Sequence, residues 1–373
     1  MKKVLSCILS LVLCIVLRTP VYADEVNTSA RAYALYCMNN GEVLLSRNAD
    51  ERLPMASTTK IMTTLLTLEA AAEDNRVITF TDEMTAEGSS MYLKIGEKVT
   101  LYDLAVGMMM QSGNDAANAA AISVAGSMED FADLMNARAE QLGMRNTHFV
   151  TPSGLDDGEH YSSAYDMALL MNAAMANADF SAITGNTSMT VTFVEPSDKT
   201  VSYPNHNKLL TLYDACIGGK TGYTDSAGRC LVTCAERDGL RLIAVTLDDG
   251  DDWDDHMALY DYGFAQYSAV RTEDFSSAAD VVGGTADSVT VSADSISFVL
   301  PKGGDEKLKI TVYLPSFLYA PVVSGEEVGK VVYTIDDTVV AEAPLCADSG
   351  VEYNSRRRGI FEYIKDLFNW HSW

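Results

Sequence analysis

The chain carries the stretch Ser57-Thr58-Thr59-Lys60 shortly after Pro54, at the start of a run of helical composition over residues 56–70. Residues three positions apart on a helix share one face, so Ser57 and Lys60 are predicted to be neighbours at its first turn. A serine becomes a nucleophile only when a base takes its proton, and a lysine is such a base only when neutral. Lys60 must therefore be buried or close to a second cation. Ser-x-x-Lys strings are common, so this stretch alone is weak support for a catalytic site.

Two further short motifs follow along the chain, Ser112-Gly113-Asn114 and Lys220-Thr221-Gly222. Taken alone, the first is equally a loop that caps the following helix, and the second is equally an ordinary edge strand. In a catalytic site, Ser112 would relay a proton between Lys60 and a leaving nitrogen. Asn114 would hydrogen-bond the substrate amide and hold Lys60 in place.

The Lys220 motif supplies the remaining chemistry. Lys220 would supply a second cation close to Lys60, and with Thr221 it would hold a substrate carboxylate. Gly222 would let an extended peptide approach the edge of the strand. The position of Ser57 near a helix N-terminus also places a backbone N–H where an oxyanion would develop. Together, the three motifs indicate acyl transfer on a peptide that ends in a free carboxyl group.

The hydrophobic pattern predicts an α+β fold in which an antiparallel sheet is flanked by helices and carries a helical insert. A hairpin is expected over residues 31–46, around the turn Asn39-Asn40-Gly41. Further helices are expected over residues 104–110, 115–125, 128–142, 163–176 and 253–264. Strands are expected over residues 217–224, 228–235 and 240–247.

A change of composition near residue 270 divides the chain. Residues 24–270 contain all three motifs and form the predicted catalytic domain. Residues 271–352 are rich in alternating Val and Thr, with a possible hairpin turn at Asp336-Asp337, and predict a small all-β domain. No residue of this second domain has a pattern typical of catalysis.

Both ends of the chain differ from the two domains. Lys2 and Lys3 precede an apolar run and a small-residue cleavage signal, so residues 1–23 are interpreted as an export signal cut before Asp24. A retained membrane anchor is the alternative. Residues 353–373 combine Arg356-Arg357-Arg358 with an aromatic-rich amphipathic pattern, which favours a helix lying on an anionic bilayer. Its alternative is a terminal helix docked on its own protein. The preferred interpretation is an exported protein attached peripherally to the outer face of the cytoplasmic membrane.

Charge and cysteine content exclude several other classes of function. The formal charge of −25 becomes −28 once Lys2, Lys3 and Arg18 leave with the signal, and so acidic a domain repels nucleic acid. Five cysteines then remain, an odd and scattered set, which predicts buried free thiols rather than a disulfide framework or a zinc site. No His-Glu-x-x-His string or Ser-His-Asp pattern is present. We expect neither a metal nor a cofactor.

The triple Ser-x-x-Lys, Ser-Gly-Asn and Lys-Thr-Gly resembles the motif set of penicillin-binding proteins and class A β-lactamases. More closely, the chain is similar to low-molecular-mass penicillin-binding proteins of the D-alanyl-D-alanine carboxypeptidase type, which are serine peptidases. The similarity extends to residues 88–97, 111–116 and 151–155, to Asn207-Lys208-Leu209-Leu210, and to the β-rich domain with its amphipathic C-terminus.

This resemblance implies that Ser57 forms an acyl-enzyme, Lys60 accepts its proton, Ser112 relays protons and Lys220 binds the substrate carboxylate. It also implies an oxyanion hole formed by the backbone N–H groups of Ser57 and Tyr223. The implied substrate is the peptidoglycan stem peptide ending in D-Ala-D-Ala, with β-lactams as inhibitors. His206 stands where family members often carry a basic residue, which leaves the auxiliary carboxylate contact open.

Two alternatives remain at this point. A class A β-lactamase would need a glutamate for the deacylating water, and residues 150–176 have no Glu-x-x-Leu-Asn string. A catalytically silent cell-wall scaffold should have lost Ser57, Lys60 or Lys220, and all three are present.

Overall fold

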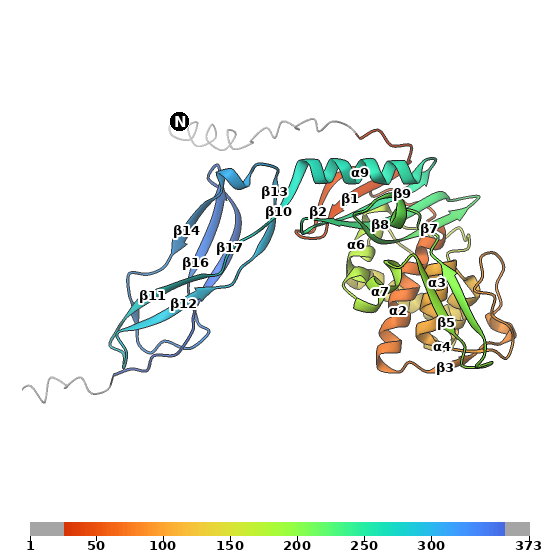
Figure 1. Cartoon of the computed structure of the whole chain (residues 1–373), viewed down its shortest axis with the longest axis horizontal. Coiled ribbons are helices and arrows are strands. Elements are labelled where there is room, and N and C mark those ends of the chain that lie inside the picture. Colours follow the sequence, from red (N-terminus) through yellow and green to blue (C-terminus); the bar gives the residue numbers. More distant parts are fainter. Residues whose placement is uncertain (1–25, 355–373) are drawn as a thin grey trace, which may run out of the picture.

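The computed structural model describes residues 26–354. Figure 1 shows a first unit of mixed helices and strands, followed by a second unit built almost entirely of strands. The predicted α+β catalytic unit followed by an all-β domain is therefore confirmed. The proposed export signal and the terminal amphipathic helix from residue 355 onward lie outside the described residues.

The first unit is built around a five-stranded sheet with strand order β2-β1-β9-β8-β7. All four neighbouring pairs are antiparallel. The strands are β1 (Ala32–Cys37), β2 (Glu42–Arg47), β7 (Cys216–Thr224), β8 (Gly228–Arg237) and β9 (Leu240–Asp249). The predicted first hairpin and the three later strands are thus present, and β7, which carries Lys220, is an edge strand.

Successive side chains along a strand point to opposite faces of the sheet. In this sheet both faces carry apolar side chains, and helices cover both. On β9, Ile243 and Val245 join a core formed with the main helical layer, whereas Leu242 and Ala244 join a second core beneath α9 (Asp252–Gln266). The main helical layer contains α2 (Lys60–Glu73), α3 (Leu101–Gln111), α4 (Asn114–Ala125), α5 (Met128–Leu142), α6 (Ala164–Met175) and α7 (Ala178–Thr184). The helices expected from the sequence therefore occur within a few residues of their predicted bounds.

The motif Ser57–Lys60 spans two consecutive helical elements, which places Ser57 near the first turn of a helix, as the sequence predicted. The residues Ala56–Thr59 form a 3-10 turn, η1, and the α-helix α2 begins only at Lys60. Side chains three apart are eclipsed in a 3-10 turn, so Ser57 and Lys60 remain neighbours.

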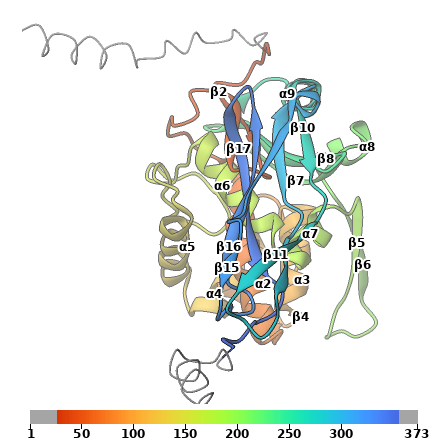
Figure 2. The same ribbon diagram turned by 90° about the vertical axis from the view of Figure 1, so that its left-hand side faces the viewer.

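Several short elements were not predicted. They are β3 (Val77–Thr79), η2 (Asp82–Met84), β4 (Lys98–Thr100), β5 (Ser188–Thr192), β6 (Thr200–Pro204) and α8 (Leu209–Leu212). The β5–β6 hairpin, at the right-hand side of Figure 2, packs against α3. It is polar on its outer face and lacks a tight-turn signal such as Asn-Gly, which explains why pattern analysis missed it.

The second unit begins with β10 (Tyr267–Arg271), which pairs with β13 (Ser297–Pro301). A six-stranded sheet follows in the order β14-β16-β17-β12-β11-β15. Its strands are β11 (Phe275–Val282), β12 (Ser288–Ala293), β14 (Lys309–Tyr313), β15 (Leu318–Tyr319), β16 (Glu327–Ile335) and β17 (Thr338–Ala347), with the short turn η3 (Asp305–Lys307) before β14. Alternate β12 residues Val289, Val291 and Ala293 face its core. The predicted turn at Asp336 and Asp337 joins β16 to β17.

The five cysteines of the described chain are free thiols, four of them buried and Cys346 half-buried. None of the helices within residues 26–354 combines the length and apolar character that a bilayer crossing requires.

Candidate active site

The three sequence motifs lie on separate elements that meet at the β7 edge of the central sheet. Ser57 lies in η1 and Lys60 opens α2, while Ser112 lies between α3 and α4. Lys220 lies on β7, which packs directly against η1. The fold therefore assembles residues that are far apart in the chain into one site.

Lys60 is completely buried, and its Nζ has three polar neighbours. These are Ser57 Oγ at 3.1 Å, Asn114 Oδ1 at 2.7 Å and the Ser153 carbonyl oxygen. The Asn114 amide orientation follows from its Nδ2, which donates to the Glu87 carbonyl at 2.7 Å. Amide and carbonyl oxygens can only accept, so a neutral Lys60 gives each of them one N–H. Its lone pair is then left facing the hydroxyl of Ser57.

The electrostatic environment favours this neutral form. Burial, and secondly the nearby ammonium of Lys220, hold the pKa of Lys60 well below its usual value, while the carboxylate of Asp115 offsets part of the effect. Burial costs free energy mainly in the charged state, and a second cation adds repulsion. This is the direction that the sequence argument required for a lysine acting as a base.

Ser112 adopts the left-handed conformation, with φ 55°, at the C-terminal end of α3. Its Oγ accepts a hydrogen bond from Lys220 Nζ at 3.1 Å. A non-glycine residue in this region is strained, and such strain commonly occurs at functional sites. The sequence placed Ser112 beside Lys60 as a proton relay, whereas the hydrogen bond that it makes in the structure is to Lys220.

Lys220 is 1% exposed. Besides Ser112 it donates to the Thr221 carbonyl at 2.7 Å, and burial lowers its pKa to about 7. Its ammonium thus lies behind the wall of the site, while the Thr221 side chain faces the cavity.

Gly222 lies where β7 touches the Ser57 turn. A Cβ atom at residue 222 would stand 3.0 Å from the Met55 carbonyl oxygen and 3.1 Å from the backbone nitrogens of Ser57 and Thr58. The sequence assigned this glycine to substrate approach. The structure adds a second task, since the absent side chain lets the strand and the turn pack together.

A cavity of about 370 Å³ opens above these residues. Its walls combine the motif residues with side chains that no motif indicated. They are Ser57, Ser89, Ser112, His206, Lys208, Thr221, Gly222, Tyr223, Arg229, Asp252 and Trp253. Among the predicted site residues, Lys60, Asn114 and Lys220 are not on this surface but behind it.

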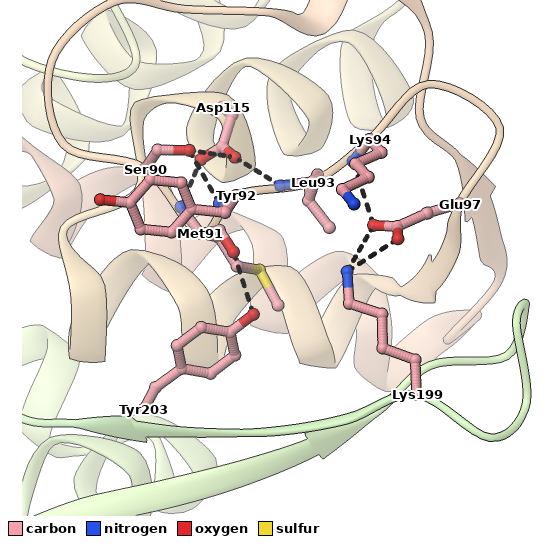
Figure 3. Close-up of polar contacts among 9 residues, drawn as sticks. All are labelled: Ser90, Met91, Tyr92, Leu93, Lys94, Glu97, Asp115, Lys199 and Tyr203. Atoms are coloured by element: carbon pink, nitrogen blue, oxygen red, sulfur yellow. Dashed lines mark hydrogen bonds and ion pairs between the residues drawn. The ribbon is translucent and has the colours of Figure 1, made fainter.

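Ser89 lines the cavity from a loop that Asp115 holds in place. Figure 3 shows the contacts of Asp115 with the next residues of this loop, Ser90 to Leu93. The Asp115 carboxylate accepts hydrogen bonds from Ser90 Oγ at 2.7 Å, from the Met91 N–H at 2.8 Å and from the Leu93 N–H at 3.1 Å. Asp115 is 3% exposed. Sequence reasoning treated this aspartate only as a helix start, and the one available signal was its place directly after Asn114.

The far end of the same loop is anchored separately. The Glu97 carboxylate accepts from Lys199 Nζ at 2.7 Å and from the Lys94 N–H at 3.0 Å (Figure 3). Lys199 comes from the loop of the β5–β6 hairpin, and Tyr203 of β6 donates to the Met91 carbonyl at 3.0 Å. The hairpin that the sequence failed to predict therefore supports one wall of the site.

The segment that presents the Ser153 carbonyl to Lys60 is also tightly fitted. Gly154 has φ +82°, and a Cβ atom there would overlap the Ala56 carbonyl. His160 Nε2 lies 2.8 Å from Thr59 Oγ1, and its Nδ1 accepts from the Val150 N–H at 2.9 Å. His160 is thus a buried structural histidine, in agreement with its isolated place in the sequence.

The charge at His206 bears on the carboxylate contact that the sequence left open. Partial burial and the charge of Lys220 lower the pKa of His206, so the imidazole is neutral at physiological pH. Exposed cations on the cavity surface are instead Lys208 and Arg229.

Within residues 26–354, no group of three His, Cys, Asp or Glu side chains is arranged to hold a metal ion.

The catalytic unit matches the family model described as D-alanyl-D-alanine carboxypeptidase over residues 19–251. The chain belongs to this D-alanyl-D-alanine carboxypeptidase family. The second unit matches the C-terminal domain of penicillin-binding protein 5 over residues 267–353. Both units that the sequence distinguished are thus related to known domains.

Full-length relatives support the same assignment. The chain is 30% identical to the D-alanyl-D-alanine carboxypeptidase DacF of Bacillus subtilis, covering 98% of this chain and 97% of that one. It is 33% identical to DacC of Escherichia coli, covering 94% and 90%. Penicillin-binding protein 5 of Haemophilus influenzae superposes with a TM-score of 0.72 at 30% identity, covering 87% of this chain and 98% of that chain.

This carboxypeptidase is therefore a serine hydrolase of the penicillin-binding type, as the sequence predicted. The matches favour neither of the two alternatives, a class A β-lactamase and a catalytically silent scaffold.

Proposed function

We propose that Ser57 attacks the carbonyl carbon of the peptide bond between the two terminal D-alanines of a peptidoglycan stem peptide. Lys60, neutral in its buried position, takes the proton from the hydroxyl 3.1 Å away. This contact is the observation that carries the proposal, because the other two hydrogen-bond partners of Lys60 can only accept.

The tetrahedral oxyanion binds to the backbone N–H groups of Ser57 and Tyr223. The close packing at Gly222 supports this role, since it joins the Ser57 turn to the strand that carries residue 223. Preorganised donors of this kind stabilise charge that develops only in the transition state.

The leaving nitrogen must gain a proton before the C–N bond breaks. Ser112 lines the cavity and accepts from Lys220, so its own hydroxyl proton is free to pass to that nitrogen while Lys220 resupplies it. D-alanine leaves, and the rest of the peptide remains as an ester on Ser57 Oγ. Water then attacks the ester and gives up a proton that passes through Ser112 to Lys220, while Lys60 returns its proton to the departing Ser57 Oγ. This step restores the serine, the neutral Lys60 and the charged Lys220.

The terminal carboxylate binds along β7, where Thr221 faces the cavity and Lys220 adds positive potential from behind. A β-lactam presents a carboxylate and a strained amide with a similar spacing. It acylates the same serine, and the ester persists because the leaving group stays attached.

A labelling experiment tests this assignment. The purified protein is incubated with a fluorescent penicillin and, separately, with a peptide ending in D-Ala-D-Ala. We expect stable labelling and release of D-alanine, and the loss of both in Ser57→Ala. Rapid turnover of the lactam or an absence of labelling would contradict the proposal.

We further propose that the chain is exported and held on the outer face of the membrane by residues 353–373. The support is the basic cluster Arg356-Arg357-Arg358 beside an amphipathic aromatic segment. Removing residues 355–373 should release the protein from vesicles that contain anionic lipid, measured by co-sedimentation, without changing penicillin labelling. Equal sedimentation of both forms would contradict attachment through this segment.

A further inference from the structure

The cation that the sequence assigned to the substrate carboxylate does not reach the cavity. Lys220 is 1% exposed, and its ammonium donates to Ser112 Oγ and to the Thr221 carbonyl. A carboxylate lying against Thr221 would therefore feel the potential of Lys220 but meet a different side chain. Among the described residues that line the cavity, Lys208 and Arg229 are exposed cations, and Arg229 lies on the sheet itself.

Strand register places Arg229 on the correct side of the sheet. Arg229 of β8 is the cross-strand partner of Tyr223 on β7, two residues beyond Thr221. Paired residues on antiparallel strands present their side chains to the same face, and so do residues two apart along a strand. The guanidinium of Arg229 thus shares one face with Thr221, on the cavity that also contains Ser57.

Two residues at the start of α9 hold this guanidinium in place. Arg229 Nη2 donates to Asp252 Oδ1, and Arg229 Cζ lies 5.8 Å from the centre of the Trp253 ring. The Asp252 side chain is 4% exposed and that of Arg229 is 44% exposed. A buried carboxylate therefore fixes one edge of an arginine whose other N–H groups remain accessible.

The negative charge of Asp252 does not prevent Arg229 from binding a carboxylate. Arg229 and Asp252 together are neutral, so the pair contributes directed donors rather than net charge, and Lys220 and Lys208 supply the net positive potential. A guanidinium has five N–H donors in a planar fork that matches a carboxylate in two places. Holding the fork in advance lowers the entropy that binding would otherwise cost.

We propose that Arg229 forms the direct ion pair with the terminal carboxylate of the substrate, with Asp252 and Trp253 as its positioning residues. This inference rests on the proposed carboxypeptidase function and makes Arg229 the residue that selects a free C-terminus. A substrate peptide that continues beyond the second D-alanine, or that ends in an amide, would leave the guanidinium without its anionic partner.

The test compares two peptides ending in D-Ala-D-Ala, one with a free acid and one with a C-terminal amide. Arg229→Gln should lower kcat/KM for the acid by about 100-fold, the loss expected for charge-assisted hydrogen bonds, and should change the amide rate by less than about threefold. Arg229→Lys should recover part of the acid rate, because it keeps the charge without the fork. Asp252→Asn should raise KM for the acid more than it lowers kcat.

The matched control is Arg237→Gln, which removes an arginine from the same strand outside the cavity and should leave the acid-to-amide ratio unchanged. An equal loss of both rates in Arg229→Gln would show a structural role only and overturn the inference. Calorimetric binding of the two peptides to Ser57→Ala, with and without Arg229→Gln, keeps the test independent of turnover. If D-alanine release failed in the wild type but Arg229 still governed acid binding, the proposed function would fall and this inference would stand.

Discussion

Gly222 lies so close to the catalytic turn that a Cβ atom on it would stand 3.1 Å from the backbone nitrogen of Ser57. The contact joins a sheet edge to the first residues of the helical layer through backbone alone. It sets the distance between the Ser57 turn and strand β7, whose N–H groups are proposed to bind the oxyanion. The geometry of the site thus depends on residue 222 being a glycine, which has no side chain.

Gly222→Ala should impair acylation without unfolding the protein. The backbone at residue 222 does not need a positive φ, so the added methyl group acts only by pushing η1 away from β7. A shift of a few tenths of an ångström should slow labelling by a fluorescent penicillin by about tenfold, given that a 1 Å misplacement can cost about 100-fold. Gly158→Ala is the control, because no atom lies within 4 Å of a Cβ there. Unchanged labelling in Gly222→Ala would contradict this account.

The two site lysines should produce a bell-shaped pH profile of kcat/KM. Activity rises with pH as Lys60 loses its proton, and the lowered pKa of Lys60 puts this limb on the acid side. Activity falls again as Lys220, whose pKa burial lowers to about 7, loses the charge that attracts the carboxylate. In Lys220→Arg the falling limb should move to higher pH, because a guanidinium stays charged. A wild-type profile that is flat between pH 6 and 8 would count against these roles.

The local part of the site could be predicted from the sequence. The spacing of Ser57 and Lys60 makes them neighbours in either an α-helix or a 3-10 turn. Three consecutive strands were expected over residues 217–247, and they form β7, β8 and β9. The neutral state of Lys60 followed from the requirement that a base have a free lone pair.

Contacts between distant segments could not be predicted in the same way. The hydrogen bond from Lys220 to Ser112 depends on how β7 packs on the α3–α4 junction, and no local pattern encodes that packing. Arg229 reaches the cavity only through its register with Tyr223 and its contact with Asp252. One sequence in isolation shows neither relationship.

Asp115→Asn should disturb both the loop and the base. An amide accepts at only one of its two positions, so part of the set of hydrogen bonds to Ser90, Met91 and Leu93 is lost. Removing the Asp115 charge also removes a factor that raises the pKa of Lys60. We therefore expect slower turnover together with an acid limb of the kcat/KM profile that moves to lower pH.

Glu97→Gln provides the comparison for this variant. It weakens the other anchor of the same loop, the ion pair with Lys199, without removing a charge that acts on Lys60. It should slow turnover less and leave the acid limb where it is. A shift of the limb in Glu97→Gln but not in Asp115→Asn would refute the electrostatic role of Asp115.

Buried His256 should make folding stability fall in mild acid. Its ring contacts Thr233 Oγ1 at 2.7 Å and Thr246 Oγ1 at 3.1 Å, and burial lowers its pKa to about 3. The unfolded chain, with a histidine pKa near 6.5, therefore binds more protons than the folded chain between about pH 6.5 and 3. Stability gained from the neutral ring is complete above this range and is lost as the pH falls through it.

Urea unfolding of the wild type and His256→Gln at pH 7 and pH 4.5 measures this effect. The variant should be less stable at pH 7, because it loses packing and at least one hydrogen bond. At pH 4.5, two units below the unfolded pKa, the wild type loses about 2.7 kcal/mol of stability that the variant does not lose. The difference in stability between the two proteins should shrink by that amount. A difference that stays constant with pH would mean that the ring is already protonated in the folded protein, in conflict with its burial between two threonine hydroxyls.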